Sequence, residues 1–222
     1  MRASNCRWAS SDSAASVRSL LSAPPKVVWR LKAKEDRRFR TGHPWVYSNE
    51  LQGSPKGIQP GDPVELCDAA GNFLARGYGN PASLIAFRAL SRNPEEKAPQ
   101  SLDALVFALQ RAVGLRRSLG LLDFSFRLCH GESDGLPGLV IDHYRLESGE
   151  RVFAVQAHTA GADRWIPFMA EVLDRLELGT PERSAIVIRN DLAIRKLEGL
   201  SEEEPRVLRE VPGLALSNDP IL

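Results

Sequence analysis

Residues 127–144 read RLCHGESDGLPGLVIDHY and gather a thiol, two imidazoles and three carboxylates into one short stretch. Cys129 beside His130 suggests a thiol nucleophile and its base, but neighbouring residues on a strand point to opposite faces. Cys129 follows Leu128 at an alternating apolar position, which favours packing in a core. Ser133 lies in GESDG, which is not the GxSxG turn of a strand–helix nucleophile. The stretch therefore offers no convincing nucleophile.

The carboxylates of the same stretch allow a second interpretation. Glu132, Asp134 and Asp142 could act as a general acid and a general base. Alternatively, Asp134 and Gly135 shape a turn, and Glu132 accepts hydrogen bonds from backbone N–H groups. The residue types favour the turn, so we expect no catalytic residue in this chain. The three cysteines lie far apart and no Cys/His spacing is typical of zinc, so we expect no metal site either.

A cofactor site in a Rossmann-like fold needs a strand, then a glycine-rich turn, then a helix. The GYG of GYGNP follows a predicted strand, but Asn-Pro comes next and no helical pattern follows. The glycines of HGESDGLPG lie between two strands, and no GxxxxGK[ST] loop occurs. We therefore expect this chain to bind no cofactor.

Basic residues concentrate between positions 26 and 40, with aromatic residues close behind them. The net charge is only +1, so a polyanion would have to meet a local basic patch. Cations pair with phosphates and flat rings stack on unpaired bases. The alternative is a solvated strand face with the aromatic rings in the core. The predicted RNA-contacting residues are Lys34, Arg37, Arg38, Arg40, His43, Trp45 and Arg76.

The elements that must position these residues fall into two predicted regions. Short apolar runs separated by Gly/Pro turns over residues 26–92 indicate a small all-β barrel. Residues 101–200 combine an amphipathic helix, SLDALVFALQRAVGLRRSLGLL, with several strands and a second helical stretch, so we expect a mixed α+β domain. The predicted fold class is therefore α+β. Residues 1–25, rich in Ser, Ala and Arg, are expected to be a disordered leader or an organellar transit peptide, and residues 201–222 a tail.

Composition is that of an ordinary globular protein, with 43% hydrophobic and 26% charged residues. No apolar run approaches the roughly 20 residues that a membrane helix needs. Cysteine usage does not suggest a disulfide framework, so a reducing compartment is expected. We therefore expect a cytoplasmic location, or an organellar one if the first 25 residues are a targeting peptide.

Several stretches together resemble a known family. GHPWVYSNEL, followed by GDPVEL and GNFLARGYGNPASLIAFRAL, resembles the PUA domain that opens a class of S-adenosylmethionine-dependent ribosomal RNA cytosine-C5 methyltransferases. RLCHGESDGLPGLVIDHY resembles the central domain of that family. IVIRNDLAIRKLEGL resembles a later strand of the same domain and the basic stretch after it. The resemblance covers roughly residues 27–200.

The resemblance implies a function and a departure from the family pattern. In this family the PUA domain is implicated in binding RNA, and the substrate is large-subunit ribosomal RNA. A cysteine attacks the base so that C5 can accept the methyl group from S-adenosylmethionine. That cysteine and the cofactor site lie in a C-terminal Rossmann-like domain. After Glu210 this chain reads only VPGLALSNDPIL, so we expect the Rossmann-like catalytic domain to be absent and the chain to be inactive alone.

Three functions therefore remain open. The first is the RNA-binding and positioning portion of a ribosomal RNA methyltransferase, and the second is a free-standing RNA-binding adaptor. The third is an enzyme within the central domain that uses Glu132, Asp134 or His130. The first also predicts self-association, because the surface that packs on a catalytic domain would be exposed and apolar.

Overall fold

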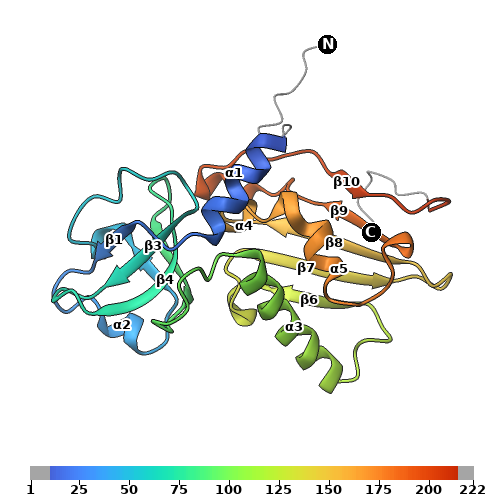
Figure 1. Ribbon diagram of the computed structural model, residues 1–222, viewed down its shortest axis with the longest axis horizontal. Helices are drawn as coiled ribbons and strands as arrows, with labels where there is room; N and C mark the ends of the chain where they lie inside the picture. The colour runs from blue at the N-terminus through green and yellow to red at the C-terminus, as the bar shows by residue number, and fades with distance from the viewer. Residues whose placement is uncertain (1–10, 215–222) are drawn as a thin grey trace, which may run out of the picture.

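The computed structural model describes residues 11–214 and places their strands in two five-stranded sheets that lie next to each other (Figure 1). The first sheet has the strand order β1-β3-β4-β5-β2. Its β1 and β3 run parallel and its other pairs are antiparallel. These strands are β1 (Val27–Arg30), β2 (Trp45–Tyr47), β3 (Asp62–Cys67), β4 (Phe73–Gly79) and β5 (Ile85–Ser91).

The second sheet has the strand order β10-β9-β8-β7-β6, in which only β8 and β9 are parallel. The chain crosses from β8 to β9 through helical segments, as a parallel pair requires. The strands are β6 (Phe126–His130), β7 (Leu139–Arg145), β8 (Arg151–Ala157), β9 (Ser184–Ile188) and β10 (Arg206–Arg209).

Helices cover one face of the second sheet (Figure 1). These helices are α1 (Ser11–Ser22), α3 (Leu102–Ser118), α4 (Ala160–Asp163) and α5 (Met169–Asp174), whereas α2 (Arg37–Arg40) packs on the first sheet. Five 3-10 turns complete the elements, η1 (Ser48–Glu50), η2 (Gly131–Asp134), η3 (Ile166–Phe168), η4 (Pro181–Arg183) and η5 (Ala193–Glu198). No helix within residues 11–214 combines the length and the apolar character that crossing a membrane requires.

The periodicity of the sequence explains how the second core forms. In α3, Leu105, Leu109 and Val113 follow each other at four-residue spacing and are all buried. In β7, alternate residues such as Leu139 and Ile141 enter the same core. Helix and sheet therefore share one apolar interior.

The start of α3 is fixed by its capping residue. The Ser101 hydroxyl accepts a hydrogen bond from the backbone N–H of Ala104 at 3.2 Å. We expect Ser101→Ala to lower the free energy of unfolding by about 1 kcal/mol, because that N–H loses its partner. Urea unfolding measures the change. Ser118→Ala, which alters an exposed hydroxyl at the other end of the helix, is the control. Equal losses in both variants would contradict the capping role.

The prediction that residues 26–92 form a barrel of strands alone is wrong. Arg37–Arg40 form the helix α2, held by the backbone bond from Arg40 N–H to the carbonyl of Asp36 at 2.8 Å. Phe39 enters the core of the first sheet, where its ring lies 6.3 Å from that of Phe87. Burial of this one ring turns the short basic segment into a helix, whereas its residue types suggested a strand edge.

The predicted disordered leader also differs from the structure over part of its length. Residues 11–22 form α1, whose Val17 and Leu21 are buried in the core of the second sheet. Leu21 is fully buried. These two apolar residues, four apart, give the helix a buried stripe despite its otherwise small and polar composition. Residues 1–10 and 215–222, the last of which end the predicted tail, lie outside the described residues, whereas β10 lies within that tail.

A buried polar cluster joins the two sheets. Glu198 on η5 accepts hydrogen bonds from Arg88 at 2.8 Å, from Ser83 at 2.7 Å and from Asn80 at 3.0 Å. All four side chains are buried. Because the donors come from β5 and the loop before it, this carboxylate ties the second sheet to the first.

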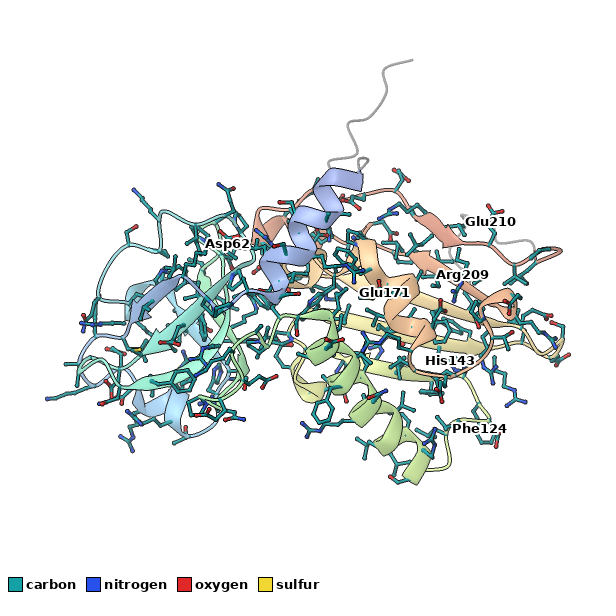
Figure 2. All side chains as sticks on the ribbon, in the orientation of Figure 1. Asp62, Phe124, His143, Glu171, Arg209 and Glu210 are labelled. Carbon is teal, nitrogen blue, oxygen red and sulfur yellow. The ribbon has the colours of Figure 1, made fainter. Side chains whose placement is uncertain are left out.

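Two further contacts cross the same boundary. The hydroxyl of Tyr78 donates to the carbonyl of Pro137 at 2.9 Å. The guanidinium of Arg164 donates to Asp62 at 2.7 Å (Figure 2) and to the carbonyl of Pro60 at 2.9 Å. The two sheets therefore meet through many directed bonds, which fix their relative orientation.

Candidate nucleic-acid interface

The turn before α2 and the first residue of that helix expose two cations, Lys34 and Arg37. Lys34 has a left-handed backbone, with φ of 72°, and its side chain is exposed. Lys34 and Arg37 line a shallow hollow together with Glu35, Arg38, Thr41 and Glu50. Within residues 11–214, neither Lys34 nor Arg37 forms an ion pair. Their charges are therefore available to an anion at this surface.

Arg38 and Arg40 belong to the same surface but are already engaged. Arg38 donates to both carboxylate oxygens of Glu50 at 2.9 Å, and its guanidinium lies 4.9 Å from the ring centroid of Tyr47. Arg40 pairs with Asp36 at 2.5 Å and with Asp68 at 2.8 Å. Hydrogen bonding to Asp36 raises the pKa of Arg40 above its usual value. These two arginines hold the surface together more than they offer free charge.

Arg76 is not part of this surface. Its side chain is buried, pairs with Glu65 at 2.7 Å and donates to the carbonyls of Pro94 and Glu96. Its guanidinium also lies 4.8 Å from the ring centroid of Phe73. Every one of these contacts secures the first sheet and its following linker, so the structure gives no support to the predicted RNA contact of Arg76.

His43 and Trp45 lie together at the start of β2. Their rings meet edge to face, with centroids 5.3 Å apart and planes at 81°. The indole N–H of Trp45 donates to the Glu132 carboxylate at 2.9 Å. Trp45 is partly exposed rather than sealed in the core. The structure therefore brings a half-open aromatic ring beside the basic hollow.

Arg92 belongs to this neighbourhood although the sequence analysis did not select it. Its guanidinium lies 4.0 Å from the ring centroid of Phe39 and donates to the carbonyl of His43 at 3.0 Å. Burial lowers its pKa from the usual value. The sequence could have indicated Arg92 as a surface cation, since it directly follows the last strand of the first sheet. We assigned it to the polar linker instead.

The stretch at 127–144 forms β6, the turn η2 and β7, as the turn interpretation predicted. Cys129 is fully buried and its thiol donates to the carbonyl of Leu139 at 3.2 Å. Burial raises the pKa of Cys129 to about 12, so the thiolate needed for attack is scarce at neutral pH. His130 is exposed on the opposite side of the strand. The pair is not a catalytic dyad.

The carboxylates of this stretch have structural partners. Asp134 forms an ion pair with Arg116 and accepts the backbone N–H of His130 at 2.7 Å. Burial disfavours its charged form, but these bonds outweigh burial and hold the pKa of Asp134 below its usual value. Asp142 pairs with Arg127 at 2.8 Å. Neither carboxylate is placed as a free acid or base.

Two observations bear on which described residues could hold a metal ion or a nucleotide-like cofactor. No group of three or more His, Cys, Asp and Glu residues between positions 11 and 214 is arranged to hold a metal ion. A Cβ atom at Gly77 would lie 1.9 Å from the carbonyl oxygen of Arg88, and one at Gly79 would lie 2.5 Å from the ring of Trp29. The GYG segment ends strand β4 and is not a turn, and its two glycines make room for protein atoms.

Comparison with known proteins now gives these features a context. Residues 30–92 match a family described as a PUA-like domain. The chain has a PUA-like domain. The matched residues include β2 to β5 of the first sheet, the hollow beside α2 and Trp45, and they end at Arg92.

The chain is homologous to ribosomal RNA large subunit methyltransferases. It is 36% identical over 183 residues to Ribosomal RNA large subunit methyltransferase I of Erwinia tasmaniensis. This alignment covers 82% of the chain. It is 34% identical over 194 residues to the enzyme of that name from Shewanella denitrificans, covering 84%. The chain spans only 43% and 45% of the lengths of these two relatives.

Two solved structures share the fold of this chain. One, described as a SAM-dependent methyltransferase from Streptococcus mutans, aligns with a TM-score of 0.60 over 84% of this chain and 44% of its own length. The other, described as a methyltransferase complexed with SAH, aligns with a TM-score of 0.58 over 73% of this chain and 40% of its own. Both are 12% identical, so the likeness concerns the fold alone.

These alignments overturn the predicted fold class. That prediction set the chain apart from the methyltransferase fold, as a barrel and a linking domain with the catalytic fold absent. Most of the described chain instead superposes on methyltransferase structures. The sequence could not show that the two sheets form one unit. They are held together by the buried polar cluster around Glu198.

Proposed function

We propose that this chain binds and positions large-subunit ribosomal RNA for a methyltransferase that uses S-adenosylmethionine and methylates cytosine at C5. The observation that carries the proposal is the hollow beside α2, where Lys34 and Arg37 are exposed without acidic partners in the described chain. The homologous enzymes act on ribosomal RNA, which supports this polyanion over others. A cytoplasmic location agrees with that substrate.

The geometry suits positioning more than chemistry. Free cations at Lys34 and Arg37 can meet phosphates, and the partly exposed Trp45 can stack on a base. The bonds between the two sheets hold these groups in one orientation. No described side chain is arranged as a nucleophile or a cofactor ligand, so methyl transfer itself is not assigned to residues 11–214.

The predicted self-association stays a prediction. Its candidate surface is the outer side of α3 and the loop after it, where Phe107, Leu119 and Phe124 are exposed. Each of these three side chains is 63% exposed. Such residues would be the first to contact a second molecule.

The basic hollow is tested by the salt dependence of RNA binding. Fluorescence anisotropy with a labelled single-stranded ribosomal RNA fragment gives the dissociation constant at several salt concentrations. We expect Lys34→Ala with Arg37→Ala to lower the slope of log affinity against log salt by about 1.4, or about 0.7 for each lost phosphate contact. Binding should weaken at every salt concentration.

The matched control removes the same charge elsewhere. Arg111→Ala with Arg117→Ala deletes two exposed cations from α3. This variant should keep the wild-type slope to within about 0.3, since α3 lies away from the hollow. Equal slopes in the two double variants would refute the assignment of the hollow, and salt-independent binding by the unchanged protein would refute the proposed function.

A further inference from the structure

The PUA-like sheet and the second sheet meet at Trp45. Its indole N–H donates to Glu132 at 2.9 Å across 87 residues of sequence. Trp45 lies opposite Arg88 in the β2–β5 pair, so both side chains leave the same face of the sheet. Arg88 on that face reaches Glu198 in the second sheet's unit. The Trp45 ring therefore lies at the boundary between the two sheets.

Trp45 is held in place from several sides. The His43 ring packs edge-on against it, and Arg38 donates to the Trp45 carbonyl at 3.2 Å. Together with the bond to Glu132, these contacts fix the plane of the indole. The ring is nevertheless only partly buried. A rigid and partly open aromatic face is what stacking on an unpaired base requires.

Glu132 is also fixed in position, because its short turn is clamped on both sides. Asp134 accepts the backbone N–H of His130 and pairs with Arg116 on α3. Gly135 ends the turn in the left-handed conformation, with φ of 75°. The Glu132 side chain is exposed. A carboxylate is an acceptor with about four lone-pair sites, and the indole N–H occupies one of them.

We propose that Trp45 and Glu132 together form a site for a single unpaired base that carries an exocyclic amino group. The base stacks on the indole and its amino group donates to the carboxylate. Guanine fits best, because its N1–H and its amino group lie side by side and can both donate to one carboxylate. Uracil fits worst, because its carbonyl oxygens flank its single N–H and face the negative charge.

This inference rests on the proposed function, since it names what the RNA-binding surface selects. It also explains why the site spans the boundary. The stacking ring comes from the PUA-like domain and the selecting carboxylate from the second sheet. A base preference would therefore require both sheets in their observed orientation. The buried polar cluster around Glu198 would then contribute to base recognition as well as to stability.

The test uses the full chain and ten-nucleotide single-stranded RNA probes that differ at one central position. The probes are oligouridine with uracil, guanine or inosine at that position, and fluorescence anisotropy gives each dissociation constant. We expect guanine to bind at least about fivefold tighter than uracil, with inosine in between because it lacks the amino group. These measurements need no variant, so they do not depend on a mutant folding.

Two variants assign the preference to residues. Glu132→Gln removes the negative charge and adds a donor, so the guanine-to-uracil ratio should fall to within about twofold. Glu147→Gln, the same change at an exposed position on the β7–β8 hairpin, should keep the ratio. Trp45→Phe keeps a ring but loses the indole N–H, and it should weaken all probes.

The outcomes separate this inference from the proposed function. Equal binding of all probes, with the salt slope intact, would overturn the base site and leave RNA positioning standing. A preference that survives in Glu132→Gln would also overturn it, and Trp45 and Glu132 would then form only a contact between sheets. No salt-dependent binding of any probe or of the ribosomal RNA fragment would instead refute the proposed function.

Discussion

Replacing Glu198 with glutamine is expected to lower the free energy of unfolding by about 3–5 kcal/mol, because it leaves a buried cation without its counter-charge. Arg88 is 5% exposed and Glu198 is 3% exposed. The carboxylate accepts from Arg88, Ser83 and Asn80 at once. Within the described residues Glu198 is the one carboxylate that forms an ion pair with Arg88, so the arginine relies on it for charge balance.

Urea unfolding of the variant and the wild type measures this loss. Asp123→Asn is the matched control, because it also turns a carboxylate into an amide within an arginine pair. The Asp123 side chain is 87% exposed, so its pair with Arg145 should contribute less than about 1 kcal/mol. If Glu198→Gln and Asp123→Asn lower the free energy of unfolding by the same small amount, the buried polar cluster does not fix the two sheets together.

Lowering the pH from 7 to 4 is expected to remove about 3 kcal/mol of stability through His143 alone. His143, labelled in Figure 2, is 1% exposed, and its ring centroid lies 4.8 Å from that of Phe126 and 5.2 Å from that of Phe153. Neither imidazole nitrogen has a side-chain or backbone partner that meets normal hydrogen-bond geometry in the described structure. Burial, followed by the charges of Arg151 and Arg145, lowers the pKa of His143 from 6.5 to about 4.

The sign of this effect follows from which state binds the proton. Between pH 6.5 and pH 4 the unfolded chain binds a proton at this imidazole and the folded chain does not. Acid therefore favours unfolding throughout that window, and the contribution is complete only above pH 6.5. A folded-state pKa lower by about 2.5 corresponds to about 3 kcal/mol.

The difference between wild type and His143→Leu isolates this contribution from other titrating groups. Unfolding free energies of both proteins are measured in urea at pH 7, 5.5 and 4. The wild type should lose about 3 kcal/mol more than the variant over this range. If the unfolding free energies of the two proteins change equally with pH, the folded-state pKa of His143 is not lowered, and the prediction is wrong.

Local elements followed closely from the sequence. The predicted helix from Ser101 onward is α3, with Ser101 as its capping residue. The RVFAVQAHT and SAIVIRND stretches form β8 and β9, which lie inside the sheet and are rich in β-branched residues. Apolar periodicity and capping signals act over a few residues, so one sequence suffices to find them. The second predicted helical stretch corresponds to η3 and α5, which follow the short helix α4 between β8 and β9.

The sequence by itself determined which cations and aromatic rings the proposed RNA-binding surface can draw on, because their cluster between residues 26 and 47 is visible without any fold. Only the tertiary structure decided which of them are free. Arg38 forms an ion pair with Glu50. Arg76, which was also predicted to contact RNA, forms an ion pair with Glu65. Trp45 gains its partner Glu132 from a segment 87 residues away. Ion pairing and burial depend on distances between remote segments, and those distances exist only once the two sheets have packed.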